Sequence, residues 1–268
     1  MTSVTFVTSF SDAGWKQYGK RMLESACAFL PQNVEIVAYY NEVKPPFDNP
    51  RVRFVDNYAI EGGVREFVQK YGKNRKYSGH HPTFQNGAYN FRWDAVKFCH
   101  KPFAIEHCSR TCQSNMLIWL DADSIVFDHV PEDWFETLLP YPHYLSYLGR
   151  PAYSHTDCSF MAFRTHHPAH GEFMNRYLSI YKNGRFEGEK EYHDSYLFDL
   201  VRKEMESERK ITCYNLSKEA KGHVFINSEL GRYLDSLKGK RKETGASWRE
   251  DLVGERHEKY WQKLRKRG

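Results

Sequence analysis

An apolar run that ends in two closely spaced carboxylates is the feature that most constrains the fold of this chain. The segment NMLIWLDADSIVF, residues 115–127, holds the apolar run 116–120, then Asp121 and Asp123, then a second apolar run at 125–127. A short, uninterrupted apolar run is typical of a strand that is buried on both faces of a parallel sheet. Ligands of open α/β sheets bind at the carboxyl ends of the strands, so we expect the two aspartates at a binding site.

The two carboxylates have no basic neighbours in the sequence, which makes their placement at a buried strand end costly. Two negative charges one residue apart repel each other, and burial removes their hydration. A divalent cation relieves both problems, and hard oxygen ligands suit Mg²⁺ or Mn²⁺, which also bind phosphate oxygens. The pattern therefore predicts a metal and diphosphate site at Asp121 and Asp123. A simple turn is the alternative, because Asp-Ala-Asp-Ser is also typical of a chain reversal.

Strand-like and helix-like segments alternate along the chain. Apolar or β-rich runs predict strands at residues 4–9, 34–40, 52–55, 116–120, 143–148, 159–164 and 211–214. Helical spacing predicts helices at residues 14–30, 59–71, 91–107, 131–139, 168–181 and 193–206. This alternation favours an α/β fold with a mixed, mostly parallel sheet that is covered by helices on both faces.

The chain is long enough to bury one large core. It has 268 residues, 40% of them hydrophobic, and no internal repeat or low-complexity block divides it. We expect a single domain over residues 1–268, with a nucleotide-binding half at 1–127 and an acceptor-binding half at 128–245. A basic C-terminal tail at 246–268 would follow.

Positive charge is concentrated at the C-terminal end of the chain. From Ser236 onward there are eleven Lys and Arg residues against five acidic ones, a balance of +6 that leaves −1 for the rest of the net +5. Such a segment is suited to contact a phosphate, a nucleic acid or an anionic membrane surface. A solvated basic helix end explains the same charges, and the sequence leaves both interpretations open.

The composition favours a cytoplasmic protein. The mean hydropathy is −0.73, and no apolar run approaches the roughly 18 residues of a transmembrane helix. The first residues, MTSVTFVTSF, lack the basic start and long apolar stretch of a signal peptide. The six cysteines are scattered without a C-x-x-C pair, so we expect reduced thiols.

Several segments, taken in chain order, resemble one family. LIWLDADSIVF resembles the D-x-D segment of GT-A fold glycosyltransferases, which transfer a sugar from a nucleotide diphosphate sugar. Four other segments resemble further parts of that fold: VTFVTSF, FRWDAVKF, HTDCSFMAFR and YHDSYLFD. The late segment GHVFINSELGRYLDSLKGKRK is similar to that of glycogenin-like and bacterial galactosyltransferase-like enzymes, but it lacks their Lys-Pro-Trp.

The resemblance implies a Mn²⁺- or Mg²⁺-dependent enzyme whose donor is a nucleotide diphosphate sugar, with UDP favoured. The implied metal ligands are Asp121, Asp123 and His223. The implied donor contacts are Thr8, Ser9, Phe10, Arg92, Lys97, Asp121, Lys238 and Lys240. Several of these residues could instead have a purely structural role and contact neither the metal ion nor the donor. His223 fits an ordinary loop histidine, and the lysines near Gly239 fit an exposed basic run.

Two further aspartates are candidates for the chemical step. Asp194 stands at the predicted start of a helix, where a carboxylate can orient the sugar or take the proton of the acceptor. It is the first choice of base for an inverting reaction, and Asp157 is the second. Capping of the helix explains Asp194 equally well. The histidines at positions 80, 81, 166, 167 and 170 lack the other ligands of a known zinc site.

We expect the acceptor to be a hydroxyl group on a glycan, and a hydroxymethylated DNA base, as for an enzyme of the phage type, is the alternative. Two other classes share the main features of the sequence. A non-catalytic carbohydrate- or nucleic-acid-binding module would keep the fold without the reaction. A nucleotidyltransferase also uses paired carboxylates and a metal ion.

Overall fold

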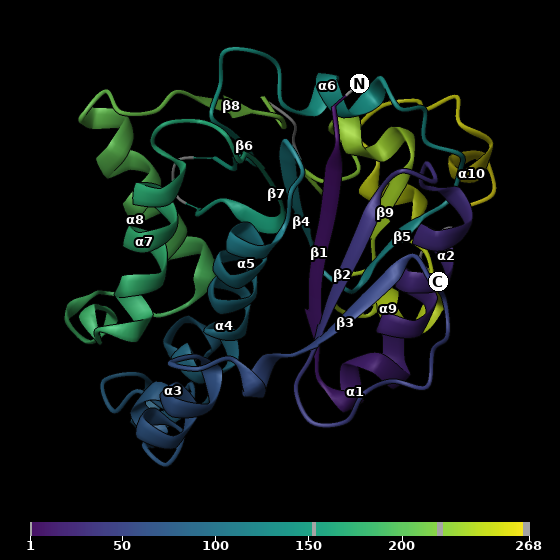
Figure 1. Cartoon of the computed structure of the whole chain (residues 1–268). Helices are drawn as coiled ribbons and strands as arrows, with labels where there is room; N and C mark the ends of the chain where they lie inside the picture. Colours follow the sequence, from purple (N-terminus) through teal and green to yellow (C-terminus); the bar gives the residue numbers. More distant parts are fainter. Residues whose placement is uncertain (1, 152–153, 219–221, 265–268) are drawn as a thin grey trace.

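A seven-stranded sheet forms the centre of the molecule in the computed structural model, which describes residues 2–151, 154–218 and 222–264. Its strand order is β3-β2-β1-β4-β7-β6-β8, and β5 and β9 form a second sheet of two strands (Figure 1). The strands of the large sheet are β1 Val4–Phe10, β2 Glu35–Tyr40, β3 Val52–Asp56, β4 Met116–Leu120, β6 Leu145–Leu148, β7 Asp157–Arg164 and β8 Cys213–Asn215. The small sheet pairs β5 Ser124–Val126 with β9 Leu234–Ser236.

All strands of the large sheet except β7 run in the same direction. β1 pairs in parallel with β2 and with β4, β2 pairs in parallel with β3, and β8 pairs in parallel with β6. β7 lies antiparallel between β4 and β6. All five residues of β4 are buried, as its uninterrupted apolar sequence predicts. The predicted α/β class with a mixed, mostly parallel sheet is confirmed.

Helices cover both faces of the sheet. The longer ones are α2 Lys20–Phe29, α3 Val64–Tyr71, α5 His100–Thr111, α7 His170–Lys182 and α8 Asp194–Ser207. The short ones are α1 Asp12–Gly14, α4 Ala95–Phe98, α6 Trp134–Leu138, α9 Arg241–Thr244 and α10 Lys259–Gln262. Figure 1 shows α3, α4, α5, α7 and α8 on one side of the sheet, with α1, α2, α9 and α10 on the other.

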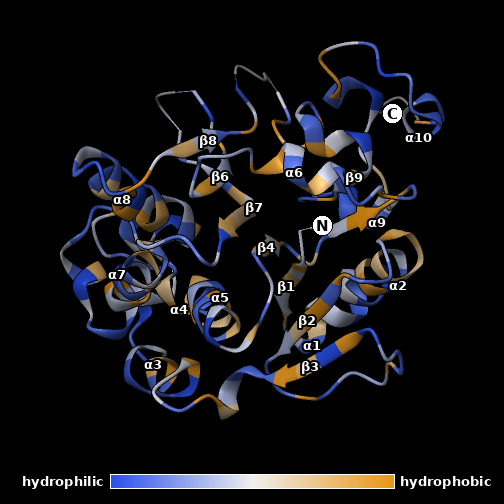
Figure 2. Ribbon diagram, turned by 45° about the horizontal axis from the view of Figure 1, so that its top comes forward, coloured by the Kyte–Doolittle hydropathy of each residue, from blue (hydrophilic) through white to orange (hydrophobic). Residues whose placement is uncertain are grey.

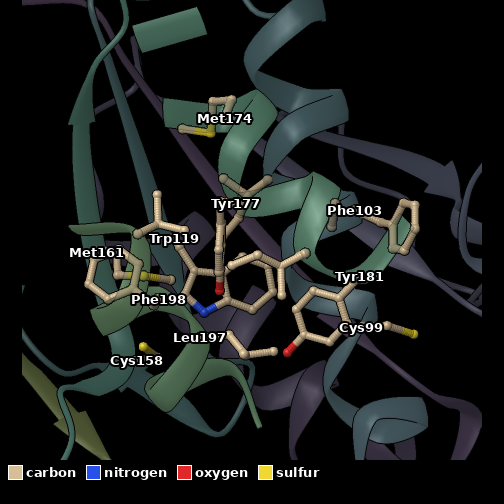
Figure 3. Close-up of a cluster of buried hydrophobic side chains, with 14 of the residues drawn as sticks. Cys99, Phe103, Trp119, Cys158, Met161, Met174, Tyr177, Tyr181, Leu197 and Phe198 are labelled. Carbon is tan, nitrogen blue, oxygen red and sulfur yellow. The ribbon is translucent and has the colours of Figure 1, made fainter. Parts of the chain in front are cut away.

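The sheet separates two hydrophobic cores. Alternate residues of β4 point to opposite faces, so Trp119 packs under α5, α7 and α8 while Leu120 packs under α2 and α6. Figure 3 shows the first core, where Trp119 lies among Tyr177, Leu197 and Phe198. Apolar residues also run along strands such as β3 and β7 (Figure 2). Burial from both sides fixes the register of the central strands and therefore the positions of the residues that follow them.

The strand register brings three sequence-distant segments to one edge of the sheet. β1 and β4 run in parallel with Val7 opposite Trp119, so residues at the end of β1 lie beside those at the end of β4. Because β7 is antiparallel, its start rather than its end reaches this edge, and the Asp121 amide donates to the Ser159 carbonyl over 2.9 Å. Asp157 begins β7 and is therefore close to the end of β4.

Two of the predicted helices are shortened or broken, one by a turn and the other by a side-chain cap. The predicted helix at 59–71 begins only at Val64, because Gly62 has a left-handed φ of 62° in the turn before it. The predicted helix at 91–107 is broken at Asp94, whose carboxylate accepts from the Lys97 amide and starts α4 anew. These breaks shift local boundaries without changing the order of strands and helices.

The predicted last strand at 211–214 is not the last one. β9 follows it, and its Leu-Asp-Ser sequence is too short and polar to show strand periodicity. Asp235 is nevertheless fully buried there, because the Ser247 amide and hydroxyl and the Tyr260 hydroxyl all donate to its carboxylate. A satisfied carboxylate at this position ties the C-terminal segment to the small sheet.

The described part of the predicted basic tail, residues 246–264, packs against the rest of the protein, and residues 265–268 lie outside the described residues. Trp261 is 2% exposed and donates from Nε1 to the Gly231 carbonyl over 2.6 Å. Tyr260 stacks on Phe127 with ring centroids 4.1 Å apart. This segment is therefore part of the second core. Within the described ranges, the helices are all too short or too polar to traverse a lipid bilayer.

Replacing Trp261 by alanine should lower the free energy of unfolding by about 3–5 kcal/mol, because the change leaves a large cavity in a packed core. Denaturant unfolding monitored by circular dichroism measures this loss. Val253→Ala is the control, since Val253 is 58% exposed and its truncation should have little effect. Equal stability of the two variants would show that the C-terminal segment does not contribute to the core.

Candidate functional site

A cavity of about 650 Å³ opens at the edge of the sheet where β1 and β4 end. Eight of the twelve residues that the sequence singled out line it: Ser9, Phe10, Arg92, Lys97, Asp121, Asp123, Asp194 and Lys238. Residues that the sequence did not single out also line it, including Tyr18, Lys101, His155, His193 and Lys242. The volume lies within the range of about 300–1,000 Å³ that is typical of small-molecule sites.

Lys101 of α5 contacts several of the residues that line the inner end of the cavity. Its side chain is buried, and its Nζ lies 2.9 Å from Asp121 Oδ1 and 2.5 Å from Asp194 Oδ2. The same ammonium group donates to the Cys158 carbonyl over 2.6 Å. Burial alone would lower the pKa of Lys101, but the two carboxylates outweigh it and raise the pKa. Lys101 is therefore held in its charged form between β4 and α8.

Asp121 and Asp123 differ in how their oxygens are satisfied. Asp121 Oδ1 accepts from Trp119 Nε1 over 2.8 Å, in addition to its contact with Lys101. Asp123 Oδ2 lies 3.1 Å from Lys242 Nζ, whereas Asp123 Oδ1 is buried and has no hydrogen-bond partner among the described residues. A buried carboxylate oxygen without a partner is costly unless a ligand satisfies it. This oxygen is the best candidate ligand atom for a metal ion.

The inner end of the cavity is balanced in charge. Four carboxylates, Asp121, Asp123, Asp157 and Asp194, contact four cations, Lys101, Arg150, Lys238 and Lys242. The aspartates of the D-x-D segment, which have no basic neighbours in the sequence, therefore have basic partners in space. The partners come from α5 and from the segment around α9, far away in sequence but adjacent in space.

Asp157 is buried beneath the cavity and is held by two cations. Its carboxylate contacts Arg150 and lies 2.5 Å from Lys238 Nζ, and it also accepts from the Ser159 hydroxyl over 2.7 Å. Burial by itself would raise the pKa of Asp157, but these partners lower it well below its usual range. Asp157 does not line the cavity, so its contacts favour a role in positioning Lys238.

Asp194 lies in the first turn of α8 and faces the cavity. The N-cap position belongs to His193, and the Asp194 carboxylate accepts from the Ser195 amide over 2.9 Å while it contacts Lys101. Burial would raise the pKa of Asp194, but Lys101 outweighs it and the pKa is lowered. A carboxylate with a low pKa is a weak base. These contacts favour orientation of a bound group over proton abstraction.

The remaining three candidates lie outside the cavity lining. His223 donates from Nε2 to the Ser236 carbonyl over 3.0 Å, so this nitrogen is already engaged by the backbone. Burial also lowers the pKa of His223. Thr8 is buried in β1, and Lys240 begins α9 as its N-cap residue. These three residues do not line the cavity, although the Ser236 carbonyl that accepts from His223 belongs to the strand residue that pairs with Ser124, next to Asp123.

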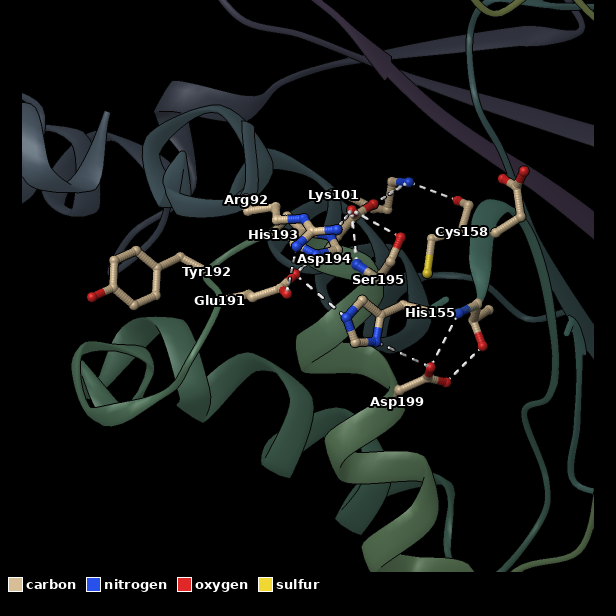
Figure 4. Close-up of polar contacts among 12 residues, drawn as sticks. Arg92, Lys101, His155, Cys158, Glu191, Tyr192, His193, Asp194, Ser195 and Asp199 are labelled. Atoms are coloured by element: carbon tan, nitrogen blue, oxygen red, sulfur yellow. Dashed lines mark hydrogen bonds and ion pairs between the residues drawn. The ribbon is translucent and has the colours of Figure 1, made fainter. Parts of the chain in front are cut away.

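A second polar cluster lies at the rim of the cavity (Figure 4). His193 donates from Nε2 to Glu191 Oε2 over 2.7 Å, and His155 Nε2 lies 3.4 Å from the same oxygen. Arg92 Nη1 lies 3.5 Å from the other oxygen, Glu191 Oε1. This cluster could not be recognised from the sequence. Glu191 and His193 are close together in the chain, but His155 comes from the distant loop before β7.

Comparisons with known proteins give little that bears on this site. No protein-family model matches the chain, and no curated protein matches it. The glycosyltransferase GlyE of Streptococcus pneumoniae TIGR4 is similar in its apo-form structure, with a TM-score of 0.45 and 13% identity. A second GlyE structure gives 0.46 and 12%. Both matches cover 81% of this chain but 46% of GlyE, so this chain spans about half of that protein. Such weak likeness transfers no residue roles.

Replacing Asp157 by asparagine should destabilise the protein at neutral pH but not in acid. Lys238 and Arg150 would lose their buried partner, and loss of one member of such a pair costs roughly 3–5 kcal/mol when the other stays buried. The cost here should be smaller, because these two side chains are 35% and 39% exposed and can regain water. Denaturant unfolding at several pH values measures the difference.

The pH dependence follows from the lowered pKa of Asp157. The folded state holds this carboxylate ionised below the unfolded-state pKa of about 3.9, so its contribution is complete above that pH. The contribution is lost as the pH falls towards the folded-state pKa. The stabilities of the original chain and Asp157→Asn should therefore converge below about pH 4. A difference that stays constant from pH 7 to pH 3 would contradict the ion-pair assignment.

Proposed function

We propose that the protein is a metal-dependent glycosyltransferase of the GT-A type that uses a nucleotide diphosphate sugar, most favourably a UDP-sugar. One observation carries the proposal. A buried carboxylate oxygen of Asp123, which has no hydrogen-bond partner within residues 2–151, 154–218 and 222–264, lies beside lysines in a cavity at the carboxyl ends of β1 and β4. Carboxylate oxygens next to cations suit a Mn²⁺ or Mg²⁺ ion that is bound together with a diphosphate.

The charge balance indicates how the donor would bind. A bare divalent cation would bring two positive charges close to Lys238 and Lys242, in a cavity that Arg92 and Lys97 also line. A metal ion together with a diphosphate enters with little net charge. The diphosphate would also attract Lys242 and Lys238, which would free carboxylate oxygens for the ion. Metal and nucleotide are therefore expected to bind cooperatively.

Different parts of the cavity would bind different parts of the donor. Ser9, Phe10 and Tyr18 line the side that follows β1, and we assign them to the base and ribose. Asp121 and Asp123 would hold the metal ion, which neutralises the charge that develops on the leaving diphosphate. His223 would join them through Nδ1, because its Nε2 donates to the Ser236 carbonyl and leaves the Nδ1 lone pair for the metal ion.

The sugar would lie on the opposite side, towards α8. Asp194 faces this side and is fixed by Lys101, so its carboxylate can accept hydrogen bonds from sugar hydroxyl groups. Arg92 and Lys97 also line this part of the cavity and supply cations near the donor. A retaining reaction needs no base at Asp194, whereas an inverting reaction would have to overcome its lowered pKa.

A glycan hydroxyl is the favoured acceptor. A DNA base acceptor or an anionic surface requires free cations on the C-terminal segment, and two of its arginines are engaged within the protein. Arg241 lies 2.5 Å from Asp251, and Arg256 lies 2.5 Å from Glu258. Among the described residues, no contact in the cavity favours a nucleotidyltransferase or a non-catalytic binding module over sugar transfer. Product analysis separates these classes, because sugar transfer releases the nucleoside diphosphate and nucleotidyl transfer releases pyrophosphate.

Thermal unfolding in the presence of Mn²⁺ and UDP-sugars tests the proposal. Together they should raise the melting temperature by roughly 5–10 °C at about 100 times the dissociation constant. Either one alone should have a small effect, because the metal and the diphosphate compensate each other's charge. Asp123→Asn should lose the metal-dependent part of the shift and the transferase activity while remaining folded.

Asp133→Asn is the matched control, since it makes the same chemical change at an exposed residue outside the cavity. It should respond to Mn²⁺ and UDP-sugars like the original chain. A full response of Asp123→Asn, or of the original chain in the presence of EDTA, would rule out the metal-dependent mechanism. No response to any nucleotide sugar would rule out the donor assignment.

A further inference from the structure

The rim cluster of His155, Glu191 and His193 has the composition of a transition-metal site. Its three candidate ligand atoms, one from each residue, all lie within 4.8 Å of one another. Two imidazoles and one carboxylate are a ligand set that zinc enzymes use for a site with an open fourth position. This set differs from the all-oxygen pair at Asp121 and Asp123, so the two places favour different ions.

Two of the three pairs of ligand atoms, those that include Glu191 Oε2, are near the spacing that tetrahedral zinc requires. Zn–N and Zn–O distances of about 2.0–2.1 Å place neighbouring ligand atoms about 3.3 Å apart. His155 Nε2 and Glu191 Oε2 are 3.4 Å apart. His193 Nε2 is 2.7 Å from the same oxygen, so it would move away by a little over half an ångström as the ion replaces the shared proton. Arg92 contacts the other oxygen of Glu191 and leaves Oε2 available.

A carboxylate lies beyond each histidine, at a distance longer than a hydrogen bond. His155 Nδ1 lies 4.0 Å from Asp199 Oδ2, and His193 Nδ1 lies 3.9 Å from Asp194 Oδ1. Carboxylates that accept from the outer nitrogen orient metal-binding imidazoles, so a metal ion at Nε2 would favour a closer approach of these two. Both are fixed from elsewhere, Asp199 by the amide and hydroxyl of Thr156 and Asp194 by Lys101. Figure 4 shows the two histidines on either side of Glu191.

We propose that His155, Glu191 and His193 form a Zn²⁺ site at the rim of the cavity, separate from the Asp121 and Asp123 site. Both histidines line the cavity, and the His155 side chain is 32% exposed, so water can reach the fourth coordination position. Zn²⁺ makes such a water more acidic and can likewise bind a hydroxyl group of a ligand. The existence of this site does not depend on the proposed transferase activity.

Titration of the chelator-treated full chain with Zn²⁺ and with Co²⁺ tests the site. Calorimetry should show one Zn²⁺ bound per chain, and Co²⁺ should give the intense visible absorption of a tetrahedral complex. His155→Ala and Glu191→Gln should weaken binding more than about 100-fold, because loss of an outer carboxylate alone costs about 10–100-fold. Asp199→Asn should weaken binding within that smaller range and keep the tetrahedral spectrum.

Two control variants separate this site from other causes. His166→Ala removes an exposed histidine outside the cavity and should leave Zn²⁺ affinity unchanged. The variant Asp123→Asn, which leaves the contacts of Lys101 with Asp121 and Asp194 in place, should also keep the Zn²⁺ site while losing the response to Mn²⁺ and UDP-sugars. Failure of the transferase proposal therefore leaves this test intact. Zn²⁺ binding that is equal in His155→Ala and the original chain, or a Co²⁺ spectrum of the hydrated ion only, would overturn the assignment.

Discussion

The candidate site depends on the contacts of one buried group, the ammonium group of Lys101. It contacts Asp121 at the end of β4 and Asp194 at the start of α8, and it bonds the Cys158 carbonyl in β7. Removing one member of such a network leaves an uncompensated buried charge, which costs far more than an exposed ion pair contributes. One side chain thus links β4, β7 and α8, which belong to different parts of the sequence. These three elements meet at Lys101 and together form the inner wall of the cavity.

The central architecture was predictable because its signal is local. Five consecutive apolar residues in β4 have few alternatives to a buried strand, and two carboxylates directly after them mark the strand end. The approximate edge location of Asp121 and Asp123 follows from that pattern, since the carboxyl ends of parallel strands share one edge. Element boundaries were less accurate where a single side chain decides them, as Asp94 does at the start of α4.

The contacts within the site were not predictable, because they join residues that are distant in sequence. Lys242 reaches Asp123 only because β9 pairs with β5, and the Leu-Asp-Ser sequence of β9 has no periodicity that reveals a strand. The same pairing places Ser236, whose carbonyl accepts from His223, opposite Ser124 and therefore next to Asp123. Sequence reasoning could identify suitable residue types, but it had no means to assign their partners.

The packing of the C-terminal segment has a consequence for synthesis on the ribosome. Asp123 directly precedes β5, which pairs with β9, and the buried Asp235 of β9 accepts from Ser247 and Tyr260. Until those residues emerge from the exit tunnel, a nascent chain lacks the donors that satisfy this carboxylate in the folded protein. A truncation before residue 247 would remove these donors together with the core residue Trp261, so its effect would reach the strand pairing beside Asp123.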